Sequence, residues 1–191
     1  MKRLIRRVRR REERGAVLVE AAFVFPVVFL VVVAVLEYGL LFAGQSTTES
    51  ATRNGARFGS ANFAVSGSKS AAADAIVGSV QKDLGALTGL DTPIKLFIYK
   101  ADATGTPTGG FTNCTSDCYR YTWNTGTKVF DFDASSPTWT NPQACVTTGT
   151  IDSIGVYLEL RHDYITHMVG TAQTLNEHTV SRLEPLPLSQ C

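Results

Sequence analysis

The stretch Arg14-Gly15-Ala16-Val17-Leu18-Val19-Glu20 decides how this chain is interpreted, because it joins a basic segment to a long apolar run. Residues 1–15 contain eight basic and two acidic side chains, whereas residues 16–36 contain a single charged side chain, Glu20. A helix of that length rises about 30 Å, which is enough to cross a bilayer. The sequence therefore predicts one membrane-spanning helix with a carboxylate near its start, and an ionisable group inside a membrane is by default functional.

The charge distribution predicts the orientation of this helix. Residues 1–15 carry a net charge of +6 and residues 16–191 carry −5, which together give the +1 of the whole chain. A basic flank stays on the cytoplasmic side, so residues 16–191 are expected to leave the cytoplasm after the span. The basic cluster is also compatible with a nucleic-acid-binding arm. Beside a membrane span, the basic cluster is better explained as a topology signal that also attracts anionic lipid. Residues 16–191 have a net negative charge, so they do not offer the positive surface that nucleic acid requires.

Several short motifs resemble a known family. These motifs are Arg14-Gly15, Val19-Glu20, Phe25-Pro26, Glu37-Tyr38-Gly39 and Ala51-Thr52-Arg53-Asn54-Gly55-Ala56-Arg57, with a weaker echo at Arg182-Leu183-Glu184-Pro185. The residues around Gly15 resemble the processing site of type IV pilins, and the further motifs resemble the TadE-like family, the minor pseudopilins of the tight-adherence (Flp) pilus system. Ala21 departs from the family, which often has Phe or Tyr after the Glu.

The resemblance implies a role for three residues and a set of partners. A prepilin peptidase would cut after Gly15, Ala16 would become the new N-terminus, and Glu20 would guide the packing of subunits. The implied partners are other pilin or pseudopilin subunits, the prepilin peptidase, membrane lipid and the pilus assembly platform. The implied location is the inner (cytoplasmic) membrane, crossed once, with the N-terminus in the cytoplasm and the C-terminal domain outside it.

The N-terminal segment also has two simpler interpretations. A plain signal anchor needs only a basic flank and about 20 apolar residues, but it does not explain the spacing of Glu20 from Gly15. A cleaved secretory signal fits less well, since its apolar region spans 7–15 residues and the nearest small-residue site is Leu41-Phe42-Ala43. The alternative function is a bitopic, extracytoplasmic binding or sensing protein unrelated to pili.

The rest of the chain predicts an α+β architecture. We expect a leader at residues 1–15, a transmembrane and stalk helix at 16–58, and an exported disulfide-containing domain at 59–191. Past the span, Glu49 and Arg53 have the i,i+4 spacing of an ion pair, and small residues nearby permit close helix packing. Within 59–191 the patterns predict a loop at 59–69, a helix at 70–87, strands at 94–99, 154–161 and 175–183, and a long loop region at 101–150. Ile154, Val156, Leu158 and Leu160 alternate and should face the core of an antiparallel sheet.

Four cysteines, Cys114, Cys118, Cys145 and Cys191, all lie outside the leader and the span. An even number of cysteines in an oxidising compartment indicates two disulfides, and three pairings are possible. A four-thiolate zinc site is the competing interpretation, although Cys114-x3-Cys118 is not the usual spacing for zinc.

The sequence does not indicate an enzyme or a cofactor. It contains no G-x-S-x-G, H-E-x-x-H or P-loop motif. His162-Asp163 could join a remote serine on paper, but any exported domain would allow the same, so each histidine is interpreted as a strand or surface residue. The aromatic residues of 101–150 could bind a ligand, and packing over a disulfide is the preferred interpretation. The expected function is therefore helix packing and protein–protein interaction, with no catalytic, cofactor or metal residues.

Overall fold

The computed structural model describes residues 2–87, 89–167 and 170–191, and for residues 2–14 and 148 it describes the backbone alone. The chain forms two compact units, one ending at Leu40 and the other spanning Leu41–Cys191. The first helix, α1, runs from Lys2 to Asn62 and so contributes to both units. It ends beyond the boundary at residue 58 that the sequence predicts, and the loop that follows it is correspondingly shorter.

The first unit is the part of α1 up to Leu40, in which a basic start is followed by an apolar run. The helix contains Pro26, which lacks an N–H and leaves the carbonyl of the preceding turn without its helical partner, a defect that membrane helices tolerate. The segment that is long and apolar enough to cross a membrane lies within Gly15–Asn62, and the most apolar stretch of it has none of its residues buried.

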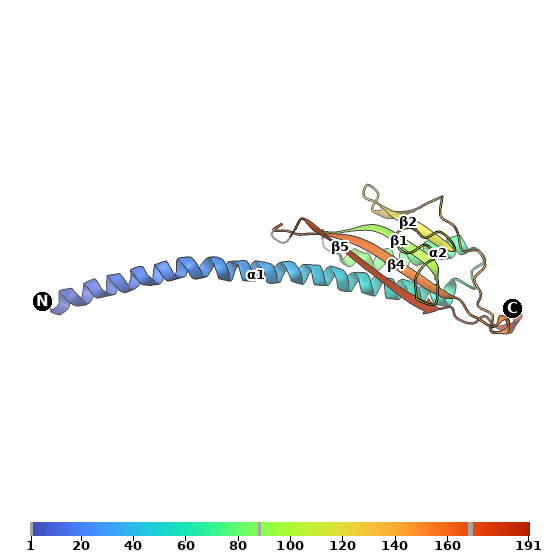
Figure 1. Cartoon of the computed structure of the whole chain (residues 1–191), viewed down its shortest axis with the longest axis horizontal. Helices are drawn as coiled ribbons and strands as arrows, with labels where there is room; N and C mark the ends of the chain where they lie inside the picture. The colour runs from blue at the N-terminus through green and yellow to red at the C-terminus, as the bar shows by residue number, and fades with distance from the viewer. Residues whose placement is uncertain (1, 88, 168–169) are drawn as a thin grey trace. The chain divides into compact units, whose positions relative to one another are not determined.

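The second unit is a five-stranded antiparallel sheet with two helical segments packed on one face (Figure 1). Its strands are β1 (Asp91–Ala101), β2 (Cys118–Asn124), β3 (Val129–Phe132), β4 (Ser153–Asp163) and β5 (Ala172–Arg182). They are arranged in the order β3-β2-β1-β4-β5, so β3 and β5 form the two edges. The helix α2 (Lys69–Asp83) begins at the N-cap Ser68, whose hydroxyl accepts a hydrogen bond from Ala71 N. Short 3₁₀ turns at Leu84–Ala86, Val146–Thr148 and Leu188–Gln190 complete the unit.

The strand β4 forms the centre of the core and confirms the alternation seen in the sequence. Ile154, Val156, Leu158 and Leu160 are all fully buried on the helical face. The last strand, β5, pairs with β4 along all eleven positions without a register shift. The strand β1 begins at Asp91, two residues before Pro93, whereas the sequence predicts a start after this proline. Pro93 cannot donate a backbone hydrogen bond to the neighbouring strand, and the register shift between Pro93 and Lys95 accommodates it.

Two strands lie where the sequence predicts only loop. Residues 118–124 and 129–132 form the hairpin of β2 and β3 within the Gly- and Pro-rich region 101–150. The signal that could have identified β2 is the alternation of Tyr119, Tyr121 and Trp123, since aromatic residues favour strands. Much of the aromatic content of this region joins the main core rather than a satellite over a disulfide, and Trp139 packs against Phe63 with ring centroids 4.9 Å apart.

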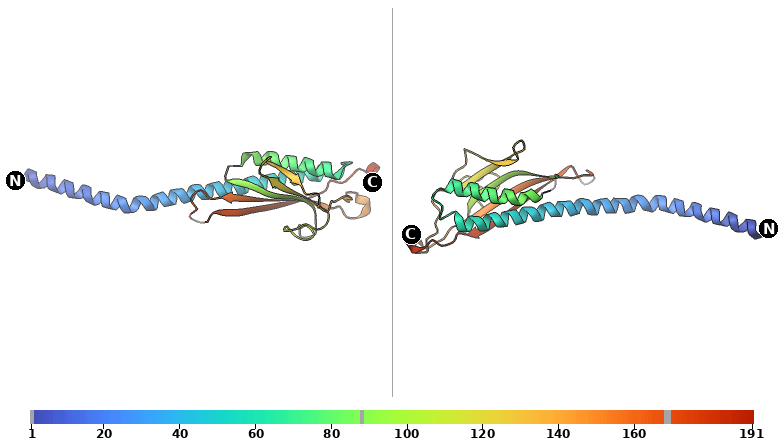
Figure 2. Two further views of the ribbon diagram at one scale, coloured as in Figure 1. Left: turned by 90° about the horizontal axis from the view of Figure 1, so that it is seen from above. Right: turned by 180° about the vertical axis from the view of Figure 1, so that it is seen from behind.

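The C-terminal part of α1 approaches the sheet and α2 closely, as Figure 2 shows from two further sides. Its buried face carries small residues at helical spacing, and these are Thr48, Ala51, Thr52, Gly55, Ala56, Gly59 and Ser60. A Cβ added at Gly55 would lie 2.6 Å from Val80 Cγ2, and one at Gly59 would lie 2.9 Å from Ile154 Cδ1. The small residues that the sequence suggested for helix–helix contact therefore serve, at least in part, to pack α1 against its own domain.

Candidate functional site

The segment from Gly15 to Glu20 is helical, and each of its residues is exposed. A Cβ placed at Gly15 would meet nothing within 4 Å. Glycine inside a helix costs about 0.5–1 kcal/mol relative to alanine, so the helix is weakened at the bond where cleavage is expected. Ala16 and Glu20 are one turn apart and therefore share a face of the helix.

Apolar side chains surround Glu20 along the helix, and they too are exposed. Leu18 is 71% exposed and Phe23 is 75% exposed. Among the side chains that the structure describes, Glu20 has no ion-pair partner. An uncovered apolar helix with one carboxylate requires lipid or another helix around it, and the carboxylate requires a positive or donating group.

The motif of residues 51–57 divides into two faces of α1 in the structure. Ala51, Thr52, Gly55 and Ala56 are buried, whereas Arg53, Asn54 and Arg57 are exposed. Arg53 pairs with Glu49 as the i,i+4 spacing predicts. Asn54 donates from Nδ2 to Asp83 Oδ2 at 2.9 Å, which joins α1 to the end of α2. The motif thus orients α1 on its domain and leaves a basic face outside.

A buried pair of titratable groups lies beside the start of the docked part of α1. His162 Nδ1 and Asp91 Oδ1 are 2.7 Å apart, and the two side chains are 0% and 1% exposed. A Cβ at Gly44 would lie 2.7 Å from the same Asp91 oxygen, so the carboxylate sits directly against the helix backbone. His162 therefore does not join the adjacent Asp163, whose carboxylate instead accepts from Arg161 Nε at 2.8 Å.

The disulfides pair Cys114 with Cys118 and Cys145 with Cys191. The first closes a loop with a sequence separation of 4, and the second joins the C-terminal residue to a loop 46 positions earlier. This is one of the three cysteine pairings that the sequence leaves open. The fold selects it, because it decides which chain segments lie next to each other.

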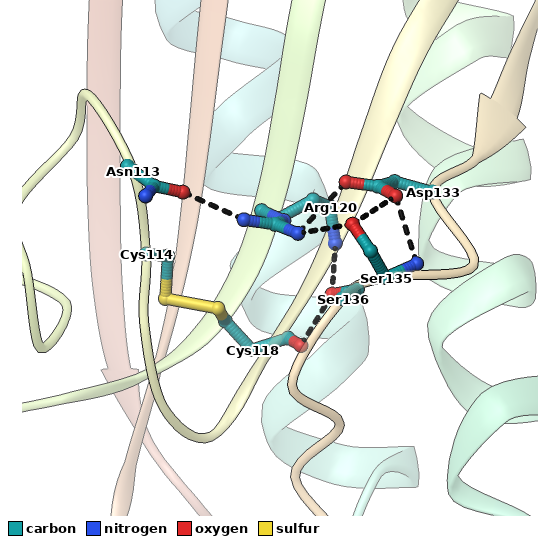
Figure 3. A network of polar contacts seen from close by, with 7 residues as sticks. All are labelled: Asn113, Cys114, Cys118, Arg120, Asp133, Ser135 and Ser136. Carbon is teal, nitrogen blue, oxygen red and sulfur yellow. Dashed lines mark hydrogen bonds and ion pairs between the residues drawn. A yellow bond between two sulfur atoms is a disulfide. The ribbon is translucent and has the colours of Figure 1, made fainter.

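The Cys114–Cys118 loop is attached to β2 and to the loop after β3 by Arg120 (Figure 3). The Arg120 guanidinium donates to Asn113 Oδ1 at 2.6 Å and to Ser135 Oγ at 2.8 Å, and it pairs with Asp133 Oδ2 at 2.9 Å. Ser136 Oγ accepts from Arg120 N and donates to the Cys118 carbonyl. Hydrogen bonds from Ser135, followed by the charge of Arg120, hold the pKa of Asp133 below its usual value.

The second face of the sheet carries aromatic side chains that the loop before Cys114 covers. Phe111 stacks on Tyr157 with ring centroids 4.6 Å apart and lies 4.8 Å from the ring of His178. Tyr99 donates from its hydroxyl to the Gly105 carbonyl at 2.9 Å. Burial, with a smaller contribution from the charge of Asp102, raises the pKa of Tyr99. These rings form a packed layer beside the first disulfide, separate from the main core that holds Tyr119, Tyr121 and Trp139.

Sequence reasoning did not identify Asp91 and Arg120 as organising residues. Asp91 gives no local signal, because its partner His162 is 71 positions away. The alternation around Arg120 would have placed it on a strand, but its partners Asn113, Asp133 and Ser135 lie outside that strand, and no local pattern identifies them.

Comparison with known proteins assigns part of the chain to a family. Residues 15–57 match the family model described as TadE-like protein, which confirms the resemblance and covers both the exposed start of α1 and its docked, small-residue part. Comparisons with curated proteins and with solved structures find no match.

Proposed function

We propose that this chain is a minor pilin-like subunit of a tight-adherence (Flp) pilus assembly system that acts through helix packing rather than catalysis. The TadE-like match by itself suggests a pilin-like protein associated with a Tad pilus. The observation that carries the finer proposal is the start of that match at Gly15, on an exposed helix whose only charge between residues 15 and 37 is Glu20.

The proposed processing step is cleavage of the Gly15–Ala16 bond by a prepilin peptidase. Cleavage removes a leader with a net charge of +6 and converts Ala16 into the first residue of α1. The N–H groups of residues 16–19 then lose their helical acceptors in the leader. Glu20 moves from the middle of a helix to a position close to its start, where the helix dipole favours a carboxylate by about 0.3–1 kcal/mol at exposed sites.

The proposed assembly step pairs Glu20 with the N-terminal amine of a neighbouring subunit. A carboxylate in an apolar environment is costly when unpaired, and a partner amine removes that cost in only one register. Residues 16–36 supply the apolar contact surface, because the small-residue face further along α1 is already used against the chain's own domain. We place the chain in the inner membrane with residues 1–15 in the cytoplasm and the second unit outside, in agreement with the basic flank.

The experiment compares intact mass and N-terminal sequence of the protein from its own cells, with and without the prepilin peptidase. A peptidase-dependent start at Ala16 is expected. An uncut chain in both strains would favour the bitopic binding or sensing protein, and a start near Gly44 would indicate a secreted domain.

The role of Glu20 is tested separately from cleavage. Glu20→Gln keeps the size and removes the charge, so we expect normal cleavage and a loss of the protein from sheared pilus fractions or of pilus formation. The matched control is Glu49→Gln, which removes a carboxylate from the same helix beyond the apolar run. Normal assembly of Glu20→Gln would refute the packing role.

A further inference from the structure

A cavity of about 570 Å³ lies in the second unit, where the end of α2 meets the hairpin of β2 and β3. Its walls come from α2 and the 3₁₀ turn after it, from the start of β1, and from the end of β2 with the turn that follows. The volume falls within the range of roughly 300–1,000 Å³ that is usual for small-molecule sites. Neither the docking of α1 nor the segment around Gly15 uses this cavity, so we asked which ligand its lining would suit.

Trp123, near the end of β2, supplies the aromatic wall of the cavity. Its ring is fixed by an edge-on contact with Phe130 on β3, with ring centroids 5.0 Å apart and the planes at 69°. The side chain is only partly buried, and in the described part of the chain its indole N–H forms no hydrogen bond. A ring that is already held in place packs against a ligand with little further loss of conformational entropy.

The turn between β2 and β3 places a positive charge at the cavity. Lys128 lines it and has a left-handed backbone conformation, with φ of 57°. Gln81 Nε2 on α2 donates to the Lys128 carbonyl at 3.1 Å, which ties the turn to the helix. The Lys128 ammonium forms no ion pair with the side chains that the structure describes. Its three N–H donors therefore remain for a ligand.

The start of β1 contributes a carboxylate to the same cavity. Asp91 lines it with a side chain that is 1% exposed, and its Oδ1 lies 2.7 Å from His162 Nδ1. Leu84 and Pro93 add apolar surface. The cavity thus brings together one aromatic ring, apolar side chains, a hydrogen-bond acceptor with negative charge and a donor with positive charge.

This mixture of groups decides the class of ligand. A cationic ligand would meet the charge of Lys128, and an anionic ligand would meet the carboxylate of Asp91; like charges at short distance are unfavourable. A purely apolar ligand would cover these polar groups without replacing their hydrogen bonds to water. A neutral sugar meets none of these costs, because its hydroxyl groups both donate and accept while the C–H groups of its ring pack on an aromatic face.

We propose that this cavity binds a neutral saccharide, with one sugar ring packed on Trp123 and its hydroxyl groups bonded to Lys128 and Asp91. Ligand pockets commonly combine apolar and aromatic walls with a few polar groups that fix orientation, and these three residues provide both. The inference rests on the proposed function only for the export of this domain, which would bring the cavity to glycans outside the cytoplasm.

The test titrates the full chain, purified from its own cells, with glucose, galactose, mannose and N-acetylglucosamine. The detergent is zwitterionic, because a sugar headgroup would compete. Binding is followed by tryptophan emission, since Trp123 is one of two tryptophans and the other, Trp139, is 1% exposed. We expect a saturable change with at least one sugar at millimolar concentration. The amino sugar and the uronic acid of the same ring should bind about tenfold more weakly, because each adds a charge that the cavity opposes.

Two glycines provide a blocking variant and its matched control. A Cβ at Gly85 or at Gly78 would meet nothing within 4 Å, but only Gly85 lines the cavity. Gly85→Phe should fill the cavity and lower the affinity about tenfold or more, whereas Gly78→Phe should retain it. Lys128→Asn removes the ammonium at a backbone conformation that asparagine tolerates, and should weaken binding about fivefold. Unchanged thermal unfolding would show that the variants fold.

The outcomes separate the saccharide site from the processing step. The inference would be overturned by no saturable change with any of the four neutral sugars, by equal or stronger binding of the charged sugars, or by an affinity that Gly85→Phe and Lys128→Asn leave unchanged. Competition by polysaccharide isolated from the same cells would identify the envelope as the source of the glycan, and sugar binding without that competition would indicate another surface. The N-terminal residue is determined in the same samples, so an uncut chain that binds sugar would refute the processing proposal and leave the saccharide site intact.

Discussion

Replacing Gly55 with alanine tests whether the TadE-like motif serves to pack α1 against its own domain. The glycine lies in the docked part of α1, and an added Cβ would be 2.6 Å from Val80 Cγ2 on α2, well inside van der Waals contact. Gly78 is the matched control, since it lies inside α2 and a Cβ there would meet nothing within 4 Å. Both substitutions make the same chemical change in a helix interior.

The expected magnitudes follow from two opposing effects. Alanine is favoured over glycine in a helix by about 1 kcal/mol, and this preference applies at both sites. At Gly55 the extra methyl also overpacks the contact with Val80, which costs about 1–3 kcal/mol. Gly78→Ala should therefore stabilise the protein by about 1 kcal/mol, whereas Gly55→Ala should have a net effect between zero and about 2 kcal/mol of destabilisation. The two variants should differ by about 1–3 kcal/mol.

The assay is urea unfolding of the full chain in detergent, followed by tryptophan fluorescence. Trp139 is 1% exposed and packs on Phe63, just beyond the end of α1, so its emission reports the release of this helix from the core. A double-mutant cycle with Val80→Ala isolates the contact, since shortening Val80 makes room for the new methyl. We expect the double variant to be more stable than the sum of the single effects by about 1 kcal/mol. If Gly55→Ala stabilised the protein as much as Gly78→Ala, the proposed close packing of the motif would be refuted.

Three further perturbations probe the second unit. Loop-closure entropy assigns about 4 kcal/mol of stabilisation to the Cys145–Cys191 disulfide and about 2 kcal/mol to the Cys114–Cys118 disulfide. Cys191→Ala should therefore lower the urea midpoint more than Cys114→Ala does. The reverse order would contradict an entropic origin of the stabilisation. The raised pKa of Tyr99 means that its stabilising contribution is present below the unfolded value of about 10 and is lost as the pH rises above it. Tyr99→Phe should therefore flatten the alkaline part of a stability–pH profile, and an unchanged slope would exclude Tyr99 as a cause. Asp91→Ala leaves His162 buried without this partner and should cost about 1–3 kcal/mol in thermal unfolding, and an effect below about 0.5 kcal/mol would show that the pair is dispensable.

Several features could be predicted because their signals are local. The long apolar run predicted the helix through Gly15 and beyond, and the alternation of residues 154–161 predicted a strand with its buried face correctly assigned. The i,i+4 pair of Glu49 and Arg53 was likewise predictable, since both partners lie on one helix turn. Each of these patterns lies within fewer than about 25 consecutive residues. Secondary structure can be predicted from such short stretches, because the spacing of apolar and charged residues differs between helices and strands.

The hairpin of β2 and β3 shows where local signals fail. Its residues are embedded among glycines, prolines and a short disulfide loop, whose turn-forming tendency obscures the alternation of three aromatic residues. The strands are stabilised by pairing with β1 and by burial of Tyr119 and Tyr121, and both effects require partners from elsewhere in the chain.

The sequence by itself determined the long apolar helix, the position of Glu20 five residues after Gly15, the α+β class and the family resemblance, because helix periodicity and charge asymmetry need no tertiary information. Only the tertiary structure decided the strand order, the disulfide pairing, the contact of Asp91 with His162, and the docking of Gly55 against Val80. These features join residues between 4 and 71 positions apart. Whether two such groups meet depends on how every intervening element packs, which no local pattern records.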